Sequence, residues 1–460
     1  MRTPIQDVDL LVIGGGKAGK TLAMDRAKAG QRVAMVERGM IGGSCINVAC
    51  IPTKALVAAA RALRTTRRAA QFGIRTGEPE VDVALLRAHK QGVVEDMVAI
   101  NHKQFLDSGM DLVIGQARFT GPRTVEVALA HGGTLMLRGA DVVINTGTRP
   151  ALPPIPGLAE ARPLTSESLL ELAALPRSMI VIGGGYIAGE FAQMLNTFGA
   201  RVTMLERDPQ LLGREDPDIA SAVAEIFAGE GIDVRTGVAV SRVTRNADSS
   251  VTAVLADHAE VTADELLVAV GREPVAADLG LDTAGVRLDE QGFVAVDDEL
   301  RTTAEHTWAA GDVAGGPQFT HRSLDDYRVL KANLAGARRS IAGRLMPYTV
   351  FLTPELARVG LTERQAREAG REVRVARIPV ATIPRARTAR ETAGMWKAVV
   401  DAHTAEILGV ALLGHEAGEA LTTVQTAMLA GLPYTALRDM VITHPTITEG
   451  LNLLFAAVPD

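Results

Sequence analysis

Two distant stretches of the chain repeat one pattern of apolar runs and glycine turns. Residues 8–13 form an apolar run that ends in glycines, followed by a helix-like stretch to Ala29 and a second apolar run over 32–37. The same order returns with the run 179–182, a glycine turn, a helical stretch and the run 201–206. Continuous short apolar runs closed by glycine are typical of strands buried in parallel sheets. The pattern therefore predicts two βαβ units of the dinucleotide-binding kind.

The pattern changes after about Pro347. The expected elements there are antiparallel strands over 348–352, 373–380, 396–401 and 407–413 and a helix over 417–430. Prolines 150, 153, 154 and 156 mark one linker, and Pro274 marks a second. We predict an α/β protein divided at 1–150, 151–274, 275–345 and 346–460, in which the last segment is an α+β domain.

Composition narrows the class of protein. Apolar residues make up 47% and charged residues 22%, which predicts a folded globular chain rather than a disordered one. The net charge of −6 gives no sign of a nucleic-acid partner. We find no run of 18 uncharged apolar residues and no signal-peptide core over 1–9, so we expect a cytoplasmic enzyme with no membrane partner.

The only two cysteines, Cys45 and Cys50, lie in one short segment. Two thiols cannot hold a chain of 460 residues together, and by themselves they do not complete a zinc site, so no metal is expected. A pair that opens and closes as a disulfide is the favoured interpretation. The alternative is two buried structural cysteines.

A glycine motif closes the first apolar run. Gly14, Gly16 and Gly19 have the G-x-G-x-x-G spacing, which lets a pyrophosphate approach a helix N-terminus. Glu37, at the end of the next strand, is placed to accept a hydrogen bond from a ribose diol.

The same segment also matches a competing motif. Residues 14–21 satisfy G-x-x-x-x-G-K-[ST], the phosphate loop of nucleotide triphosphatases. That alternative leaves Glu37, the second glycine motif and the cysteines unexplained, so it is disfavoured. Lys17 and Lys20 are then expected to be solvated or to lie on the phosphate side of the first helical turns.

The second βαβ unit opens with Gly183, Gly185 and Ala188 in the spacing G-x-G-x-x-A. Glu206 ends its second strand, where a carboxylate accepts from a free ribose diol and repels a 2′-phosphate. This favours NADH over NADPH. Arg207 follows directly and could instead turn toward a phosphate, so the preference stays open.

Taken together, these motifs and several others resemble the FAD-dependent class I pyridine nucleotide-disulfide oxidoreductases, which include dihydrolipoyl dehydrogenase, glutathione reductase and mercuric reductase. The further signatures are residues 302–312 ending in Gly311-Asp312, the strand-end turns Thr146-Gly147 and Val270-Gly271-Arg272, and the C-terminal motif from His444 to Glu449. The resemblance implies two Rossmann-like domains and a C-terminal α+β dimerisation domain. It places FAD on 1–150 and 275–345, NAD(P)H on 151–274 and the interface of a homodimer on 346–460.

The resemblance also implies roles for single residues. Cys50 is the flavin-side thiolate, Cys45 is the exchange thiol, and His444 paired with Glu449 is the general base. The remaining site residues are Lys54 near the flavin with Glu190 as its carboxylate partner, Tyr186 over the nicotinamide pocket, and Gly43, Ser44, Thr146, Gly147, Gly271, Gly311 and Asp312 around the cofactors. An ordinary buried salt bridge is the alternative for Lys54 and Glu190.

The substrate is harder to assign. The tail 451–460 has no thiols and no N-terminal CxxC module is present, so efficient mercury reduction is not expected. Thr443 precedes His444 where dihydrolipoyl dehydrogenases usually have His-Ala-His-Pro. Residues 16–23, 318–328 and 383–387 look most like the bacterial reactive-chlorine-resistance flavoenzymes, which reduce hypothiocyanous acid (HOSCN) and also Cu(II). Arg385, Arg387 and Arg390 form either a solvated loop or an anion-guiding patch.

Overall fold

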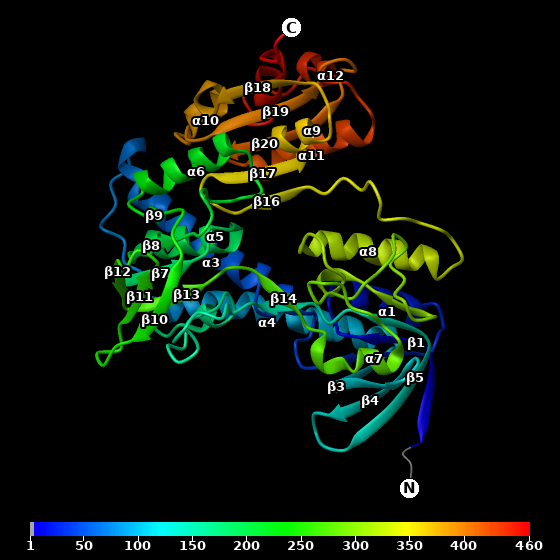
Figure 1. Cartoon of the computed structure of the whole chain (residues 1–460). Helices are drawn as coiled ribbons and strands as arrows, with labels where there is room; N and C mark the ends of the chain where they lie inside the picture. Colours follow the sequence, from blue (N-terminus) through cyan, green and yellow to red (C-terminus); the bar gives the residue numbers. More distant parts are fainter. Residues whose placement is uncertain (1–3) are drawn as a thin grey trace. The chain divides into compact units, whose positions relative to one another are not determined.

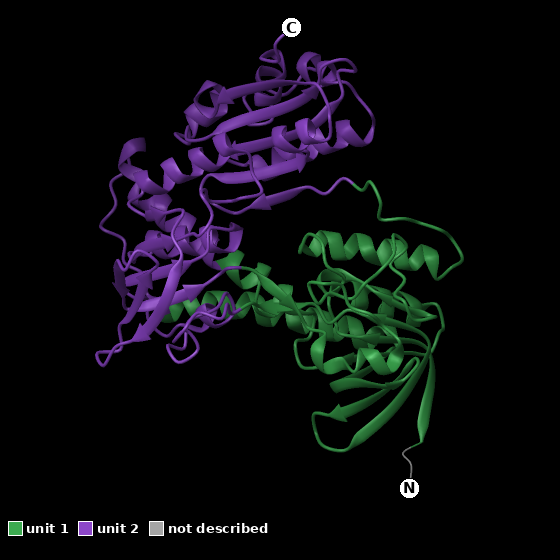
Figure 2. Cartoon of the chain, viewed as in Figure 1, with its two compact units in different colours: residues 1–55, 84–151, 271–344 green, residues 56–83, 152–270, 345–460 purple. Residues whose placement is uncertain are grey.

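The computed structural model describes residues 4–460. The first three residues, part of the stretch expected to lack a signal-peptide core, lie outside the described residues. Contacts divide the chain into two compact units (Figure 2). Unit 1 holds the chain up to Ala55, Ala84–Ala151 and Gly271–Arg344, and unit 2 holds Leu56–Val83, Leu152–Val270 and Leu345–Asp460. The four-segment division expected from the sequence stays a prediction.

Unit 1 is built on a mixed sheet (Figure 1). Its central strand β1 (Ile5–Ile13) lies parallel to β2 (Val33–Glu37) and to β5 (Thr134–Ile144), and β5 is parallel to β15 (Thr307–Ala309). β3 (Asp111–Gly121) runs parallel to β2 and continues through β4 (Thr124–Leu129) into β5 as an antiparallel meander that the sequence analysis did not predict. The first expected βαβ unit is confirmed, with its helix α1 at Lys17–Lys28.

Both faces of this sheet are buried along the second half of β1, whose successive side chains point to opposite sides and enter two separate clusters. Leu10 and Val12 of β1 pack in a cluster with residues of α1, α4 (Val83–Ser108) and α8 (Thr320–Asn333). Leu11 and Ile13 pack in a second cluster with residues of the meander and of the segment 276–313, which includes α7 (Leu281–Ala284). This explains why β1 reads as a continuous apolar run.

Of the residues expected to mark linkers, Pro150 and Pro274 lie at the ends of two short strands, whereas Pro153, Pro154 and Pro156 lie outside any strand. β6 (Thr148–Pro150) pairs antiparallel with β14 (Arg272–Pro274), so Pro150 lies opposite Arg272 and Pro274 lies opposite Thr148. Proline is tolerated at the ends of such short edge strands because no ladder N–H is needed from it there.

The first part of unit 2 contains the second expected βαβ unit. A parallel sheet has the order β13 (Glu265–Val268), β7 (Ser178–Ile182), β8 (Arg201–Leu205) and β9 (Asp233–Arg235). The helices of this part are α5 (Tyr186–Thr197) and α6 (Pro217–Gly229). A three-stranded antiparallel sheet of β10 (Val240–Arg245), β11 (Val251–Leu255) and β12 (Glu260–Ala263) was not predicted.

The last part of unit 2 is the expected antiparallel α+β domain. Its sheet has the order β16 (Tyr348–Val350), β17 (Glu355–Gly360), β20 (Ile407–Gly414), β19 (Met395–Asp401) and β18 (Val373–Pro379). The helices are α9 (Glu363–Glu368), α10 (Pro384–Thr388), α11 (Ala417–Leu429), α12 (Tyr434–Asp439) and α13 (Gly450–Ala456). The four expected strands and the helix α11 are confirmed. β17 was missed because the charged Glu355 and Arg358 interrupt its apolar pattern.

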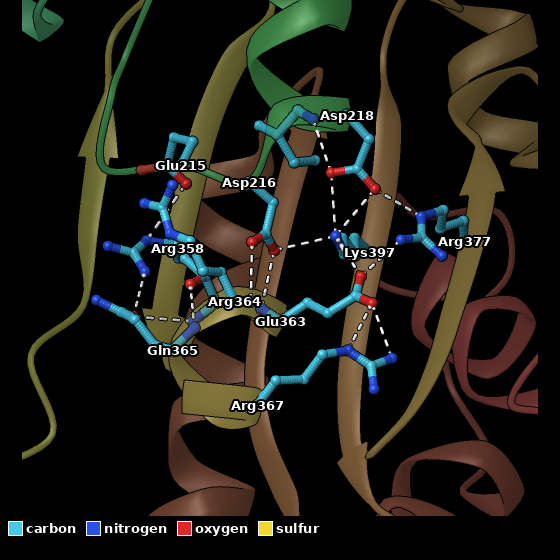
Figure 3. Close-up of polar contacts among 12 residues, drawn as sticks. Glu215, Asp216, Asp218, Arg358, Glu363, Arg364, Gln365, Arg367, Arg377 and Lys397 are labelled. Carbon is cyan, nitrogen blue, oxygen red and sulfur yellow. Dashed lines mark hydrogen bonds and ion pairs between the residues drawn. The ribbon is translucent and has the colours of Figure 1, made fainter. Parts of the chain in front are cut away.

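A buried lysine connects α6 to this sheet (Figure 3). Lys397 of β19 is 2% exposed, and its Nζ lies 3.0 Å from Asp216, 2.9 Å from Asp218 and 2.9 Å from Glu363. Asp216 directly precedes α6, and its carboxylate accepts from the backbone N–H groups of Glu363 and Arg364 at the start of α9. Three carboxylates therefore share one buried ammonium within unit 2.

The helical stretch Ser44–Arg67, made of α2 (Ser44–Asn47) and α3 (Cys50–Arg67), is long and apolar enough to cross a membrane by length and composition alone. No such candidate was expected from uncharged runs, because Lys54, Arg61 and Arg64 interrupt this stretch. The core helix of a folded protein passes the same test, and 44% of its most apolar window is buried.

Candidate active site

The first glycine motif forms a cradle that only glycine fits. Gly14 has φ of +99°, and a Cβ added there would lie 2.4 Å from the carbonyl oxygen of Asn145. A Cβ on Gly16 would lie 2.6 Å from Asn145 Oδ1, and one on Gly19 would lie 2.7 Å from the carbonyl oxygen of Gly14. Gly16 is the N-cap of α1 and has no side chain to cover the first N–H groups. The N–H groups of Ala18 and Gly19 donate to Ser323 Oγ and Asn145 Oδ1, so only the first part of this helix N-terminus is available to a phosphate.

Glu37 is buried beside this turn. Its Oε2 accepts from the backbone N–H of Gly15 at 2.7 Å, and its Oε1 accepts from those of Gly39 and Met40, both at 2.9 Å. A carboxylate has about four acceptor positions, so three are occupied here. The hydrogen bonds fix the carboxylate and leave it capacity for about one more donor, as a ribose hydroxyl would require.

Asn145, directly after β5, joins the first glycine motif to the segment that ends in Gly311-Asp312. It is 4% exposed; its Oδ1 accepts from the Gly19 N–H at 2.9 Å, and its Nδ2 donates to the Ala310 carbonyl at 2.6 Å. The next residue, Gly311, donates its N–H to the fully buried Asp326 of α8 at 2.8 Å. Asn145 and Asp326 were missed by the sequence analysis.

The expected strand-end turns lie around Asp312. Thr148 donates to Asp312 at 3.2 Å, and the Arg272 guanidinium donates to both the hydroxyl and the carbonyl of Thr148 at 2.9 Å. Burial raises the pKa of Asp312, although Arg272 and Thr148 act to lower it. The Thr146 hydroxyl donates to the carbonyl oxygen of Val275, and the backbone N–H of Val275 donates to the carbonyl oxygen of Gly147. The two turns therefore hold each other and form the surroundings of Asp312.

The cysteine loop contacts the first glycine turn. Gly43 has φ of +85°, and a Cβ there would lie 2.9 Å from the Cα of Gly16. Ser44 and Cys45 begin α2, and Cys50 is the first residue of α3. Both thiols are reduced and partly buried. The close approach of Gly43 to Gly16 brings the two sulfurs to the dinucleotide cradle.

The two thiols have different surroundings. The Cys50 sulfur lies 3.5 Å from the hydroxyl of Thr320, the first residue of α8. Cys45 has a raised pKa, because it hydrogen-bonds to Cys50 and because it is buried, whereas Thr320 and Lys20 act to lower it. The hydrogen bond to Cys50 and burial therefore favour the protonated form of Cys45.

The lysine of the competing phosphate-loop motif is buried, not solvated. Lys20 is 5% exposed, and its Nζ donates to the carbonyl of Gly42 at 3.0 Å and to Asn101 Oδ1 at 2.7 Å. The Thr21 hydroxyl donates to the carbonyl of Lys17 at 2.6 Å. These contacts engage the two side chains that a triphosphatase would use for phosphate and Mg²⁺.

The second glycine motif lies in unit 2. Gly183 has φ of +119°, and a Cβ there would lie 2.5 Å from the Ala269 carbonyl. Gly185 is the N-cap of α5, which begins at Tyr186, and Ala188 is fully buried. A Cβ on Gly184 would lie 2.7 Å from Glu206 Oε2, so this carboxylate lies against the turn.

The charged residues near this turn differ in exposure. Glu206 accepts from the N–H of Asp208 at 2.8 Å. Arg207 is 82% exposed and lies 3.5 Å from Asp208. Glu190 of α5 is 4% exposed and accepts from the Phe351 N–H at 2.9 Å. Its expected pairing with Lys54, which belongs to unit 1, stays a prediction.

The C-terminal acid–base motif forms a hydrogen-bonded pair. His444 Nδ1 lies 2.8 Å from Glu449 Oε2, and the His444 side chain is 70% exposed while that of Glu449 is 12% exposed. Thr446 donates to the Thr443 carbonyl and accepts from the N–H of Glu449, which fixes the turn. This arrangement holds one ring nitrogen of His444 and leaves Nε2 available for proton transfer.

Two further expectations can be placed. Arg385 and Arg387 lie exposed on the short helix α10, and the Arg390 guanidinium lies over the Phe72 ring at 5.8 Å. Across residues 4–460, no group of three or more His, Cys, Asp or Glu side chains could hold a metal ion.

Comparison with known proteins identifies the family. Residues 8–326 match the family described as pyridine nucleotide-disulphide oxidoreductase, and residues 346–454 match its dimerisation domain. The chain belongs to this family. It is 42% identical over 454 residues to the probable pyridine nucleotide-disulfide oxidoreductase RclA of Escherichia coli (strain K12), which covers 97% of this chain and 98% of that protein.

Two more relatives support the assignment. A mercuric reductase of Staphylococcus aureus is 36% identical over 451 residues, covering 97% of this chain and 82% of that protein. The solved Cu(II) complex of the HOCl-induced flavoprotein disulfide reductase RclA from E. coli has a TM-score of 0.91 and 41% identity, covering 99% of this chain and all of that one.

The chain is thus an oxidoreductase and a flavoprotein disulfide reductase of the RclA type, and its cofactors are FAD and NAD(P)H. The residues described above fit that conclusion, because the glycine cradle, the fixed Glu37 carboxylate and Asp312 offer what a dinucleotide with a ribityl chain requires. The dimerisation domain supports a homodimer. The triphosphatase alternative is not supported.

Proposed function

We propose that this protein is a cytoplasmic NAD(P)H-driven reductase whose Cys45–Cys50 pair reduces a small electrophile such as hypothiocyanous acid, and that it also accepts Cu(II). The observation that carries the proposal is the position of both thiols on a loop that contacts the dinucleotide cradle at Gly43 and Gly16. Bound FAD would supply the electron transfer from NAD(P)H that returns the disulfide to two thiols.

Within this proposal the two sulfurs have distinct roles. Cys50 is the thiolate next to the flavin, because Thr320 and the N-terminus of α8 favour negative charge there. Cys45 is the exchange thiol that meets substrate. Because its pKa is raised, Cys45 needs a base before it can attack.

His444 of the partner subunit is the proposed base. Glu449 accepts at Nδ1, which leaves Nε2 to take the proton of Cys45, and Glu449 stabilises the imidazolium that forms. The high exposure of His444 within one chain agrees with a role across a dimer interface. Lys54, Glu190 and Tyr186 are proposed to act on the cofactor side.

The reaction with HOSCN balances without another reactant. The Cys45 thiolate attacks the sulfur of HOSCN, so an S–S bond forms between Cys45 and the SCN group and the S–O bond breaks. The hydroxide that leaves takes the proton held by His444 and departs as water. The Cys50 thiolate then attacks Cys45, which forms the disulfide and releases thiocyanate. Two electrons pass from the dithiol to HOSCN. The products are thiocyanate and water, and the disulfide is ready for reduction.

Stopped-flow reoxidation of the two-electron-reduced enzyme tests the substrate. The reduced enzyme is mixed with HOSCN, lipoamide, oxidised glutathione, Hg(II) and Cu(II), and the disulfide is monitored through the flavin absorbance. We expect fast reoxidation by HOSCN and slow or inhibitory reaction with Hg(II), since the chain has only two cysteines to bind it. Cys45→Ser should abolish turnover, and Cys50→Ser should also abolish the long-wavelength absorbance of the reduced enzyme. Rapid catalytic reduction of Hg(II), or of lipoamide alone, would contradict the proposal.

A further inference from the structure

Lys20 is a buried charge that the proposed mechanism does not use. It lies on α1 with 5% of its surface exposed, and both acceptors of its Nζ, the Gly42 carbonyl and Asn101 Oδ1, are neutral. A buried lysine is usually paired with a carboxylate, as Lys397 is in unit 2. A buried ammonium without an anionic hydrogen-bond partner is costly, so its position suggests a use for its charge.

The contacts of Lys20 lead to the cysteine loop. Gly42 lies three residues before Cys45, and its carbonyl is held at 3.0 Å. There is no room for a side chain between them, because a Cβ on Gly42 would lie 2.8 Å from Ile46 Cδ1 and 3.4 Å from Lys20 Nζ. The ammonium therefore lies directly behind the start of the loop that carries the exchange thiol.

Charge couples the two groups. Burial lowers the pKa of Lys20 to about 8, Lys17 on the same helix acts in the same direction, and Cys45 opposes them. In turn, Lys20 acts to lower the pKa of Cys45, against the effects of Cys50 and burial. Asn101, which faces Lys20 from α4, carries no charge. A negative charge on Cys45 is thus the change that best compensates the buried ammonium.

We propose that Lys20 is a positioning residue for the cysteine loop, which holds the Gly42 carbonyl and supplies a buried positive charge to the Cys45 thiolate as it forms. The inference rests on the proposed function of Cys45 as the exchange thiol. In this inference, the anion that Lys20 stabilises is the Cys45 thiolate of the same protein, and not the triphosphate that the apparent phosphate-loop motif would predict.

The test measures Cys45 directly, without any substrate. In the FAD-loaded Cys50→Ser enzyme, Cys45 is the only thiol, and its rate of alkylation by iodoacetamide is followed from pH 6.5 to 10 by mass spectrometry. Lys20→Met keeps the chain length and removes the charge. We expect alkylation about tenfold slower at pH 7.5, with the profile moved up by about one pH unit, because a tenfold loss of thiolate corresponds to one unit.

Two matched variants separate charge from structure. Asn101→Asp places a carboxylate at the 2.7 Å contact and should neutralise the lysine, which moves the profile in the same direction by a smaller amount. Lys28→Met, at the exposed end of α1, should leave the profile unchanged. FAD content and melting temperature are measured for each variant.

A Lys20→Met profile that coincides with that of Lys28→Met would overturn the inference and leave Lys20 a structural residue. If Lys20→Met does not fold, Asn101→Asp decides, and a folded Asn101→Asp enzyme with an unchanged profile also overturns it. Failure of the proposed function is seen separately, as HOSCN turnover that survives Cys45→Ser.

Discussion

The hydroxyl of Thr320 lies 3.5 Å from the sulfur of Cys50, although the two residues are 270 positions apart in the chain. Thr320 opens α8, so a hydroxyl and a helix N-terminus act on the same sulfur. Both favour the thiolate over the thiol. This contact supports a preference for the thiolate at Cys50, the proposed flavin-side thiol.

Replacing Thr320 by Val should weaken this preference. The hydroxyl is lost while the volume is kept, so the long-wavelength absorbance of the reduced enzyme at pH 7 should fall by half or more. Titration of that absorbance with pH measures the effect. Thr320→Ser restores the hydroxyl and should restore the absorbance. An unchanged titration in Thr320→Val would show that the hydroxyl does not act on Cys50.

Replacing Asn145 by Leu should release FAD. The Gly19 N–H and the Ala310 carbonyl would both lose a buried partner, and each unpaired group costs roughly 1–3 kcal/mol. If about 1.4 kcal/mol of this is lost from cofactor binding, the dissociation constant rises about tenfold. The flavin retained after gel filtration measures the change. Gln116→Leu, on the exposed side of β3, serves as the control and should retain the flavin.

The sequence predicted the local elements well and the long-range contacts poorly. The apolar runs and glycine turns gave both βαβ units and the antiparallel domain, because burial on both faces of a strand leaves a continuous apolar signal. The signal for Asn145 was its place at the end of a buried strand before Thr146-Gly147, but its partners lie 126 and 165 residues away. Lys20 was expected to be solvated or to lie on the phosphate side, and its burial could not be predicted because it depends on contacts with α4 and with the cysteine loop.

NADH should be at least as good a donor as NADPH. The Glu206 carboxylate lies against the second glycine turn, where a 2′-phosphate would meet a like charge. Glu206→Ala should raise kcat/KM for NADPH relative to NADH by about tenfold, equal to about 1.4 kcal/mol. Asp208→Asn, which changes the neighbouring exposed carboxylate, is the control. A wild-type enzyme that strongly prefers NADPH would show that Arg207 outweighs Glu206.

Lys397→Met should destabilise unit 2 by about 3–5 kcal/mol, since three carboxylates would lose their shared buried cation. Urea denaturation measures the change. Lys103→Met removes an exposed pair with Asp107 and should cost less than about 1 kcal/mol.

The loss in Lys397→Met should depend on pH. Burial alone would raise the pKa of Asp218 and of Glu363, but hydrogen bonds from Lys397 and from arginines outweigh it and lower both. Groups with a depressed pKa stabilise the fold above about pH 4 and lose that contribution as the pH falls. The difference between wild type and Lys397→Met should therefore stay nearly constant from pH 7 to about pH 5 and narrow as the pH falls from about 5 to about 2. A constant difference would rule out the carboxylates as its source.

His444→Ala should lower turnover with HOSCN by roughly 10²–10⁴, the range for a lost general acid–base. Flavin reduction by NADH should be nearly unchanged. Mixed with Cys45→Ser chains, His444→Ala chains should regain activity, because one of the two sites in a mixed dimer combines intact cysteines with an intact histidine. Equal mixing gives about a quarter of wild-type turnover. Two inactive variants that stay inactive after mixing would place His444 and Cys45 in the same subunit's site.

The Asn145 amide also sets an order of events during biosynthesis. Gly19 leaves the ribosome early. Asn145 follows 126 residues later, and Ala310, whose carbonyl completes the Asn145 contacts, follows another 165 residues after that. At roughly 5–20 residues per second this is a delay of about 15–60 s. Throughout that interval the first glycine turn is present without the segment around Ala310 that completes its contacts. The nascent chain therefore cannot close its flavin site while it is still short, and cofactor capture belongs to the late part of synthesis.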